Sequence, residues 1–145
     1  MRIKPELPKT ILGLVLVLLT ITAANADPVR YRLEADKSSV GFTYRFEGNP
    51  IMGTMPVASA DIVIDFDRLA ASKIRIDLDA RNARAGFIFA TEAMRGKSVL
   101  DAAMHPHIRF VSTAVTQTAT GADIAGMIRI RGITKPATFT ARFYR

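Results

Sequence analysis

Two runs of residues near the C-terminal end of the chain, each alternating between a more apolar and a more polar face, limit its possible folds more than any other feature. The first runs from Ile108 to Thr116 and alternates between a more apolar face and a face that carries charge. A turn signal at Thr120 and Gly121 follows, and a second alternating run extends from Asp123 to Arg131. Because a strand places successive side chains on opposite faces, the two runs predict a β-hairpin that covers a core on one side.

The remaining alternating segments predict an all-β fold. In the first run of the hairpin, strict alternation puts Ala114 on the face of Phe110 and Val115 on the opposite face. A closed meander of antiparallel strands needs an even number of them, so an odd number predicts a barrel that is incompletely closed. Strand patterns occur in seven places, at Val29–Glu34, Val40–Phe46, Gly53–Phe66, Lys73–Asp79, Ile108–Thr116, Asp123–Arg131 and Ala137–Tyr144.

Alternation is lost between Ala83 and Met104, where the residue types favour helix. Two short helical turns separated by Gly96 are expected there, lying over one end of the sheet. The length of 145 residues predicts a single domain. The chain has no cysteine, which excludes disulfides and Cys-based zinc sites, so the core alone must hold the fold together.

The first 26 residues predict a signal peptide. Three basic residues within the first nine positions precede an apolar run from Ile11 to Ile21, and Ala24–Ala26 fits the small-residue cleavage pattern. The apolar run is shorter than the ~20 residues that a transmembrane helix needs. We therefore expect cleavage after Ala26, a β-barrel domain over residues 27–145, and a periplasmic or secreted protein. An uncleaved membrane anchor is the alternative.

The net charge of +7 raises the question of an acidic partner such as nucleic acid or anionic lipid. The positive residues are scattered along the outer positions of alternating strands, without a basic cluster and without interleaved aromatic residues. This distribution favours solvated outer faces, and we expect no nucleic-acid partner. If the protein binds a lipid, we expect contact with a membrane only for the exchange of that lipid.

Candidates for catalytic chemistry are few. His105 and His107 can share one face of a strand and bind a metal, but Pro106 can break the strand there, and the sequence fixes no third ligand. No serine lies in a Gly-x-Ser-x-Gly setting. Two pairs of carboxylates occupy outward positions beside basic residues and are interpreted as solvated charge: Asp65 with Asp67, and Asp77 with Asp79. We assign no catalytic residue, no metal site and no cofactor, and we expect that the protein is not an enzyme.

The inward positions of the predicted strands form an unusually aliphatic and aromatic set. Such a set is compatible with an ordinary packed core. It is equally compatible with a barrel whose lumen accepts an apolar ligand, and periodicity alone does not separate the two. The set, which we take as the candidate ligand-binding residues, is Phe42, Tyr44, Phe46, Met55, Ile62, Ile64, Phe66, Ile74, Ile76, Leu78, Phe110, Ile128, Ile130 and Phe139.

Several segments together resemble one protein family. The order of these segments along nearly the whole chain after residue 26 is similar to that in the YceI-like proteins, and the combination of the last two is the most specific part. The segments are VGFTYRF (Val40–Phe46), Gly53–Met55, IDFD (Ile64–Asp67), IRIDLDA (Ile74–Ala80), VLDAAMHPHIRFVST (Val99–Thr113) and GMIRIRGITKP (Gly126–Pro136).

The resemblance implies a secreted bacterial protein with a lipocalin-like antiparallel β-barrel. It implies a lumen filled by a long isoprenoid chain, such as a quinone tail or a polyprenyl phosphate, and no catalytic residues. Family sequences usually continue for further strands beyond the position of Arg145, so the resemblance also implies a shortened C-terminal part here. The alternative from a different class is an interaction protein that pairs its exposed sheet edge with another chain, a second copy of itself included. A metal-dependent enzyme that uses His105 and His107 is a third.

Overall fold

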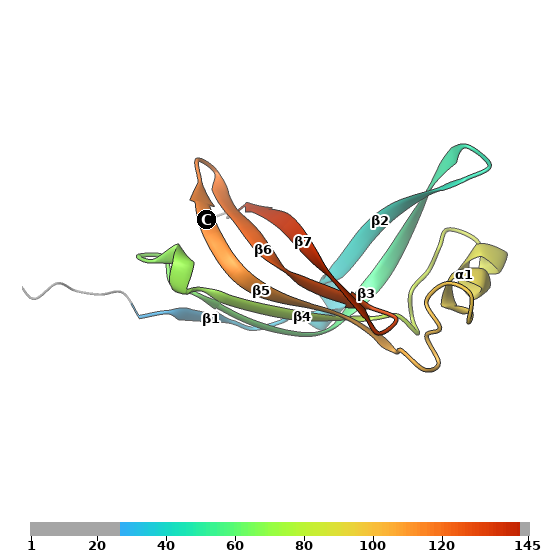
Figure 1. The fold of residues 1–145 in the computed structure, drawn as a ribbon, viewed down its shortest axis with the longest axis horizontal. Helices are drawn as coiled ribbons and strands as arrows, with labels where there is room; N and C mark the ends of the chain where they lie inside the picture. The colour runs from blue at the N-terminus through green and yellow to red at the C-terminus, as the bar shows by residue number, and fades with distance from the viewer. Residues whose placement is uncertain (1–26, 143–145) are drawn as a thin grey trace, which may run out of the picture.

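The computed structural model describes residues 27–142 of the chain. The expected signal peptide and the last residues of the seventh expected strand lie outside this range. Within it, antiparallel strands account for most of the chain, and the all-β prediction is confirmed (Figure 1). The strands are β1 (Val29–Tyr31), β2 (Ser39–Phe46), β3 (Asn49–Ile64), β4 (Lys73–Asp79), β5 (His107–Thr118), β6 (Gly121–Ile130) and β7 (Ile133–Arg142), with the helix α1 (Ile88–Arg95) and the 3-10 helices η1 (Ala35–Lys37) and η2 (Leu69–Ala71).

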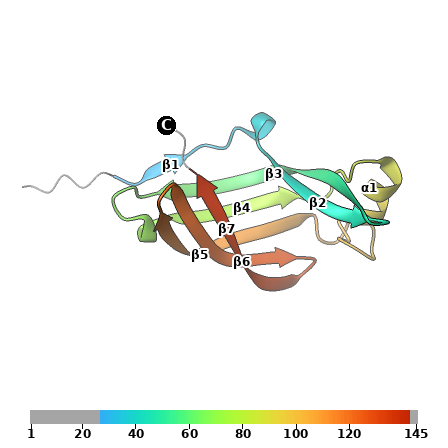
Figure 2. The ribbon, with the colours of Figure 1, turned by 90° about the horizontal axis from the view of Figure 1, so that it is seen from above.

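The strands form one sheet in the order β1-β3-β4-β5-β6-β7, and β2 pairs with β3 off this path. The long strand β3 is shared: its first half pairs with β2, and β4 pairs with the second half from Val57 onward. A bulge between Val57 and Ser59 lets β3 bend at this change of partner. The β2–β3 hairpin therefore leans away from β5 to β7, and the sheet forms an open trough (Figures 1 and 2). As expected, the barrel is not closed.

Two hairpin turns set the register at one end of the trough. Glu47 and Gly48 join β2 to β3, and Arg131 and Gly132 join β6 to β7, all four with positive φ between 47° and 83°. Two consecutive residues in this conformation make a type I′ turn, whose twist suits a tight hairpin. Strand β7 therefore starts directly at Ile133. The prediction that it starts only at Ala137 was wrong.

A bulge in β5 changes which side chains face the core. The register with β6 shifts between Ser112 and Ala114. Val115 is consequently buried against the second core cluster, and Ala114 is exposed. Strict alternation predicted the opposite orientation for both residues, and it was wrong because a bulge inserts one extra residue and inverts the pattern beyond it.

The segment between β4 and β5 contains one helix and a series of turns. Helix α1 ends at Gly96, whose N–H donates to the carbonyls of Glu92 and Ala93. The second expected helical turn does not form. The chain instead folds back on α1, with the N–H of Leu100 donating to the carbonyl of Met94 at 3.0 Å. The helical segment over one end of the sheet is confirmed, at the same end as the tip of the β2–β3 hairpin (Figures 1 and 2).

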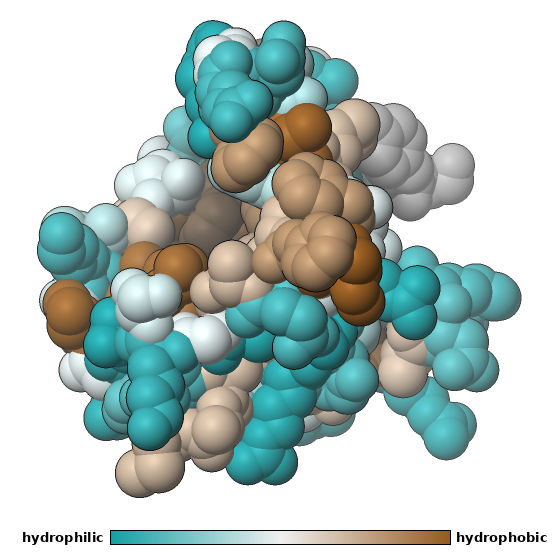
Figure 3. All heavy atoms as spheres, turned by 90° about the vertical axis from the view of Figure 1, so that its right-hand side faces the viewer, coloured by the Kyte–Doolittle hydropathy of each residue, from teal (hydrophilic) through white to brown (hydrophobic). Residues whose placement is uncertain are grey.

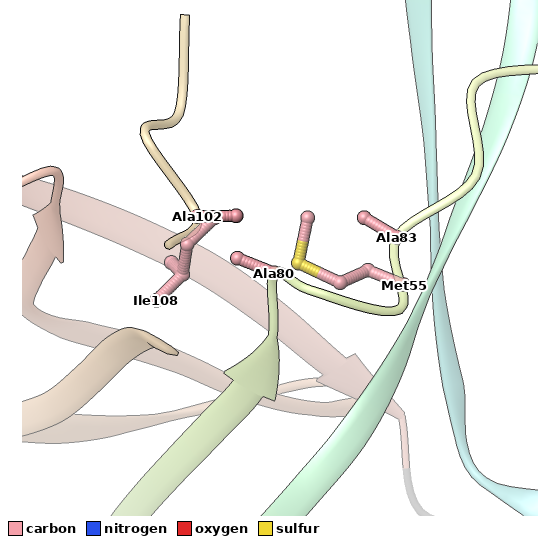
Figure 4. Packing of buried hydrophobic residues seen from close by; sticks show 5 residues of the cluster. All are labelled: Met55, Ala80, Ala83, Ala102 and Ile108. Carbon is pink, nitrogen blue, oxygen red and sulfur yellow. The ribbon is translucent and has the colours of Figure 1, made fainter. Parts of the chain in front are cut away.

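Two clusters of buried residues hold the sheet together. The first, beneath α1, consists of Met55, three alanines and Ile108 (Figure 4). The second lies further along the trough around Ile64, Ile74 and Phe110. The partly buried side chain of Ile128 packs against both clusters. The concave face is therefore apolar along the length that the two clusters cover.

Candidate functional site

The concave face holds an apolar cavity of about 480 Å³ at the end where α1 and the β2–β3 hairpin lie, and we call it the end pocket. Strand β2 gives it one wall, because its alternate residues all point into the trough. Strands β3 to β6 provide the floor, and α1 and the turn after it provide the other wall. Seven of the predicted ligand-binding residues line this cavity: Phe42, Tyr44, Phe46, Met55, Leu78, Ile128 and Ile130.

No lining residue of the end pocket carries a charge. Its one polar side-chain group, the hydroxyl of Tyr44, donates a hydrogen bond of 2.8 Å to the carbonyl oxygen of Ala85. Burial of a polar group is costly only when its hydrogen bonds are unmade, and here this one is made within the protein. The end pocket is therefore suited to an apolar occupant.

Several lining residues were missed from the sequence. Val40 extends the same alternating face of β2 by one position, so the pattern that predicted Phe42 could have included it. Ala90, Ala93 and Met94 line the wall on α1, and their spacing of three and four residues is that of one helix face. That spacing was the available signal, but alanine is too common on solvated helix faces to stand out.

A second cavity of about 700 Å³ lies further along the trough, and we call it the side groove. It runs between the segment from Tyr31 to Ser38 and the end of β7 at Arg142. Its floor is aliphatic, while its rim carries Arg32, Glu34 and Lys37. Five more of the predicted residues line it: Ile62, Ile64, Phe66, Ile74 and Ile76. The predicted set is thus divided between two cavities on one face.

The last two predicted residues, Phe110 and Phe139, line neither cavity. Their rings pack edge to face, with the centroids 4.9 Å apart and an interplanar angle of 86°. A Cβ on Gly126 would lie 2.4 Å from Cζ of Phe110, so the ring of Phe110 rests directly on this glycine. With 6% of its surface exposed, Phe110 belongs to the core that separates the two cavities. Contact of these two residues with a ligand stays a prediction.

The carboxylates interpreted as solvated charge include two that are buried. Asp65 is 2% exposed, and its Oδ1 accepts the backbone N–H groups of Asp67 (3.1 Å) and Arg68 (2.9 Å), which fixes the turn after β3. Asp77 accepts two hydrogen bonds from the guanidinium of Arg109, at 2.6 and 3.1 Å. For Asp65 and Asp77 the interpretation was wrong, because both are used to hold backbone and strands together.

The pKa values of two carboxyl groups on β4 are lowered. For Asp77, the hydrogen bond from Arg109 is the largest cause; burial opposes it, and the hydrogen bond from Ser59 adds to it. For Asp79, burial raises the pKa, but the side-chain and backbone hydrogen bonds from Asn82 and the backbone hydrogen bond from Arg81 together outweigh it. Both groups therefore stay ionised at neutral pH. They lie in neither cavity.

His105 and His107 lie where β5 begins, beside a small cavity that also contacts Arg109 and Arg129. Among residues 27–142 there is no group of three or more His, Asp or Glu side chains placed to hold a metal ion. Over the same residues, no helix has the length and apolarity required to cross a membrane. The geometry that is present is that of an apolar trough with two cavities.

Comparison with known sequences identifies one family. The model of the YceI-like domain matches residues 31–145. A UPF0312 protein of Yersinia pestis is 26% identical over 137 residues, which cover 92% of this chain and 71% of that protein. A UPF0312 protein of Pseudomonas putida is 29% identical over 152 residues, which cover 94% of this chain and 73% of that protein.

Solved structures share the fold. Burkholderia cenocepacia BcnA is similar with a TM-score of 0.59 and 21% identity over 69% of this chain. A Campylobacter jejuni YCEI protein is similar with a TM-score of 0.52 and 18% identity over 74% of this chain. The similarity spans 62% of the first structure and 64% of the second, less than two thirds of each.

Proposed function

Because this chain belongs to the YceI-like domain family, we propose that it is a non-catalytic protein that binds a long apolar lipid of the isoprenoid class, such as a quinone tail or a polyprenyl phosphate. The observation that carries the proposal is the end pocket. It is about 480 Å³ in volume, within the usual range of ligand sites, and its lining is apolar apart from the satisfied hydroxyl of Tyr44. Transfer of apolar ligand surface from water into such a cavity contributes roughly 25 cal/mol per Å².

The shape of the trough suits a long ligand better than a compact one. Ile128 lines the end pocket, and Ile124, on the same face of β6, lines the side groove. Between them Gly126 supports the buried ring of Phe110, so the two cavities are separated by apolar core residues and by no charged group. A chain of repeated apolar units can follow this face from the end pocket into the side groove. There Arg32 and Arg142 offer positive charge to a polar or anionic head, while Lys37 is paired with Glu34 at 2.8 Å.

A substitution on α1 tests the proposal with little risk to the fold. Ala90 lines the end pocket in the first turn of α1, where a carboxylate is favourable for the helix. Ala90→Glu should therefore keep the fold and abolish the binding of an apolar probe such as a polyprenol, because a charge in the pocket must be desolvated. Ala119→Glu, at the exposed β5–β6 turn, is the matched control and should bind normally.

Mass spectrometry of organic extracts completes the test. Wild-type protein purified from its native source should carry a co-purifying isoprenoid, and Ala90→Glu should carry none. If the wild type takes up no apolar probe, or if Ala90→Glu binds it as tightly as the wild type, the end pocket is not the binding site.

We further propose that the protein acts in the periplasm after cleavage before Asp27. The support is the basic, apolar and small-residue pattern of residues 1–26. The intact mass of protein from the periplasmic fraction should correspond to a chain that begins at Asp27. A mass that includes residues 1–26 would instead indicate a retained anchor.

A second candidate function is the pairing of β7 with a strand of another chain. Strand β7 ends the strand order of the sheet, and among the described strands none pairs with its outer edge. A free edge presents backbone donors and acceptors to any added strand. Binding along this edge does not use the end pocket, so Ala90→Glu separates the two candidates: it should leave edge pairing unchanged.

A further inference from the structure

Large apolar side chains are exposed around the mouth of the end pocket. They come from the end of β2, the start of α1, the turn after α1 and the β6–β7 hairpin, all at the same end of the molecule (Figures 1 and 2). Viewed from that end, apolar side chains surround a hollow (Figure 3). We call the following set the apolar rim: Phe46, Ile88, Phe89, Val99, Ile130 and Ile133.

Packing within the protein does not account for the whole rim. Phe46, Val99 and Ile130 line the end pocket from its edge. Ile88 and Phe89, however, are 66% and 79% exposed and line neither cavity. Isolated exposed apolar residues are ordinary, but a continuous apolar patch around a cavity marks an interaction surface.

The charges beside the rim favour an anionic partner. Arg45 directly precedes Phe46 on β2, and Lys97 lies two residues after α1. The guanidinium of Arg131 donates to the carbonyl of Ser98 at 3.3 Å, which holds the β6–β7 turn against that segment. Among residues 27–142 no carboxylate forms an ion pair with these three cations. Of the carboxylates near this end, Glu92 lies 3.6 Å from Arg95, Glu47 occupies the β2–β3 turn, and Oδ1 of Asp101 is buried in the turn after α1.

We propose that the apolar rim docks on the surface of an anionic lipid bilayer. Ile88 and Phe89 enter the interface between headgroups and acyl chains, and Arg45, Lys97 and Arg131 contact lipid phosphates. Apolar and aromatic side chains flanked by Lys and Arg are the combination that holds proteins at this interface. The end pocket then opens onto the membrane, so a lipid can enter it without crossing water. This last step rests on the proposed lipid-binding function, and the docking itself does not.

Vesicle binding tests the docking directly. Wild-type protein should co-sediment with phosphatidylcholine vesicles that contain about one third phosphatidylglycerol, less with pure phosphatidylcholine, and less at high salt, because exposed charges are screened. The double variant Ile88→Ser/Phe89→Ser should bind roughly tenfold more weakly, and Lys97→Glu should lose most of the dependence on phosphatidylglycerol. Val29→Ser, at an exposed position that lines neither cavity, is the control and should bind as the wild type does.

A separate measurement keeps the two proposals distinguishable. Uptake of a polyprenol added without vesicles should be unchanged in Ile88→Ser/Phe89→Ser, because neither residue lines the end pocket. Wild-type protein that takes up polyprenol but ignores the anionic vesicles would overturn the docking and leave the lipid-binding proposal standing. Vesicle binding without polyprenol uptake would overturn the lipid-binding proposal and leave the docking standing. A stable dimer in light scattering, dissociated by Ile88→Ser/Phe89→Ser, would show that a second copy covers the rim and would also overturn the docking.

Discussion

Two neighbouring residues of the sheet, Ile76 and Phe110, should respond very differently to truncation. They are directly opposite each other on β4 and β5. Phe110 is almost fully buried, its ring rests on Gly126, and it packs against Phe139. Phe110→Ala leaves a cavity, enclosed by core residues, where the ring was, so the free energy of unfolding should fall by about 3–5 kcal/mol.

Ile76 lines the side groove, so part of its side chain already faces open space. A packed isoleucine loses about 2–5 kcal/mol on truncation to alanine, through lost transfer energy and the new cavity. In Ile76→Ala the cavity cost is largely absent, and we expect a loss of only about 1 kcal/mol.

Urea unfolding of ligand-free protein measures both values, and equal slopes for all variants confirm that the same surface is exposed on unfolding. A loss for Ile76→Ala as large as that for Phe110→Ala would refute the reasoning. It would mean that the side groove is closed and packed in solution, and that the concave face is an ordinary core.

Two other features give predictions of their own. The lowered pKa of Asp77 contributes stability that is present above about pH 4 and is lost as the pH falls through that pKa. Asp77→Asn should therefore lower the free energy of unfolding by roughly 1 kcal/mol at neutral pH, and its difference from the wild type should shrink below about pH 4. Urea titrations across the acid range check this, and a difference that stays constant with pH would contradict it. We also propose that the free edge of β7 mediates self-association, so wild-type protein should grow in apparent mass with concentration in light scattering, while Thr138→Pro stays monomeric and Thr138→Val behaves as wild type. A monomeric wild type at high concentration would show that the edge is covered.

Much of the fold was predictable because side-chain alternation reports directly on which face a residue occupies. Strand β4 was predicted with its observed bounds, Lys73–Asp79, since no bulge or turn interrupts it. The bulge after Ser112 and the turn at Arg131 were not predicted. Both depend on a few backbone angles, and a non-glycine residue with positive φ, as at Arg131, leaves little trace in composition.

The candidate site was predictable only in part, for a different physical reason. The apolar character of Phe42, Ile76 and Phe110 is the same in the sequence, yet they lie in the end pocket, the side groove and the core, respectively. Their separation depends on how far the sheet curls, and that curvature follows from the bend in β3 and the bulge in β5. Local pattern identifies a concave apolar face, but only the three-dimensional path of the strands identifies which part of it is hollow.

The outer edge of β7 is protected over half its length. Ile130 and Ile133 close the β6–β7 hairpin, and in such a hairpin the closing pair exchanges both hydrogen bonds. From this closing pair, hydrogen-bonded and non-hydrogen-bonded pairs alternate along the hairpin, and Pro136, opposite Met127, falls in a non-hydrogen-bonded pair. Its backbone nitrogen therefore faces the outer edge, where proline has no hydrogen to donate. The missing donor interrupts pairing along the first half of β7, a common defence of free edges. The outer groups of Thr138 and Thr140 remain available, and it is this second half of β7 that an added strand would have to use.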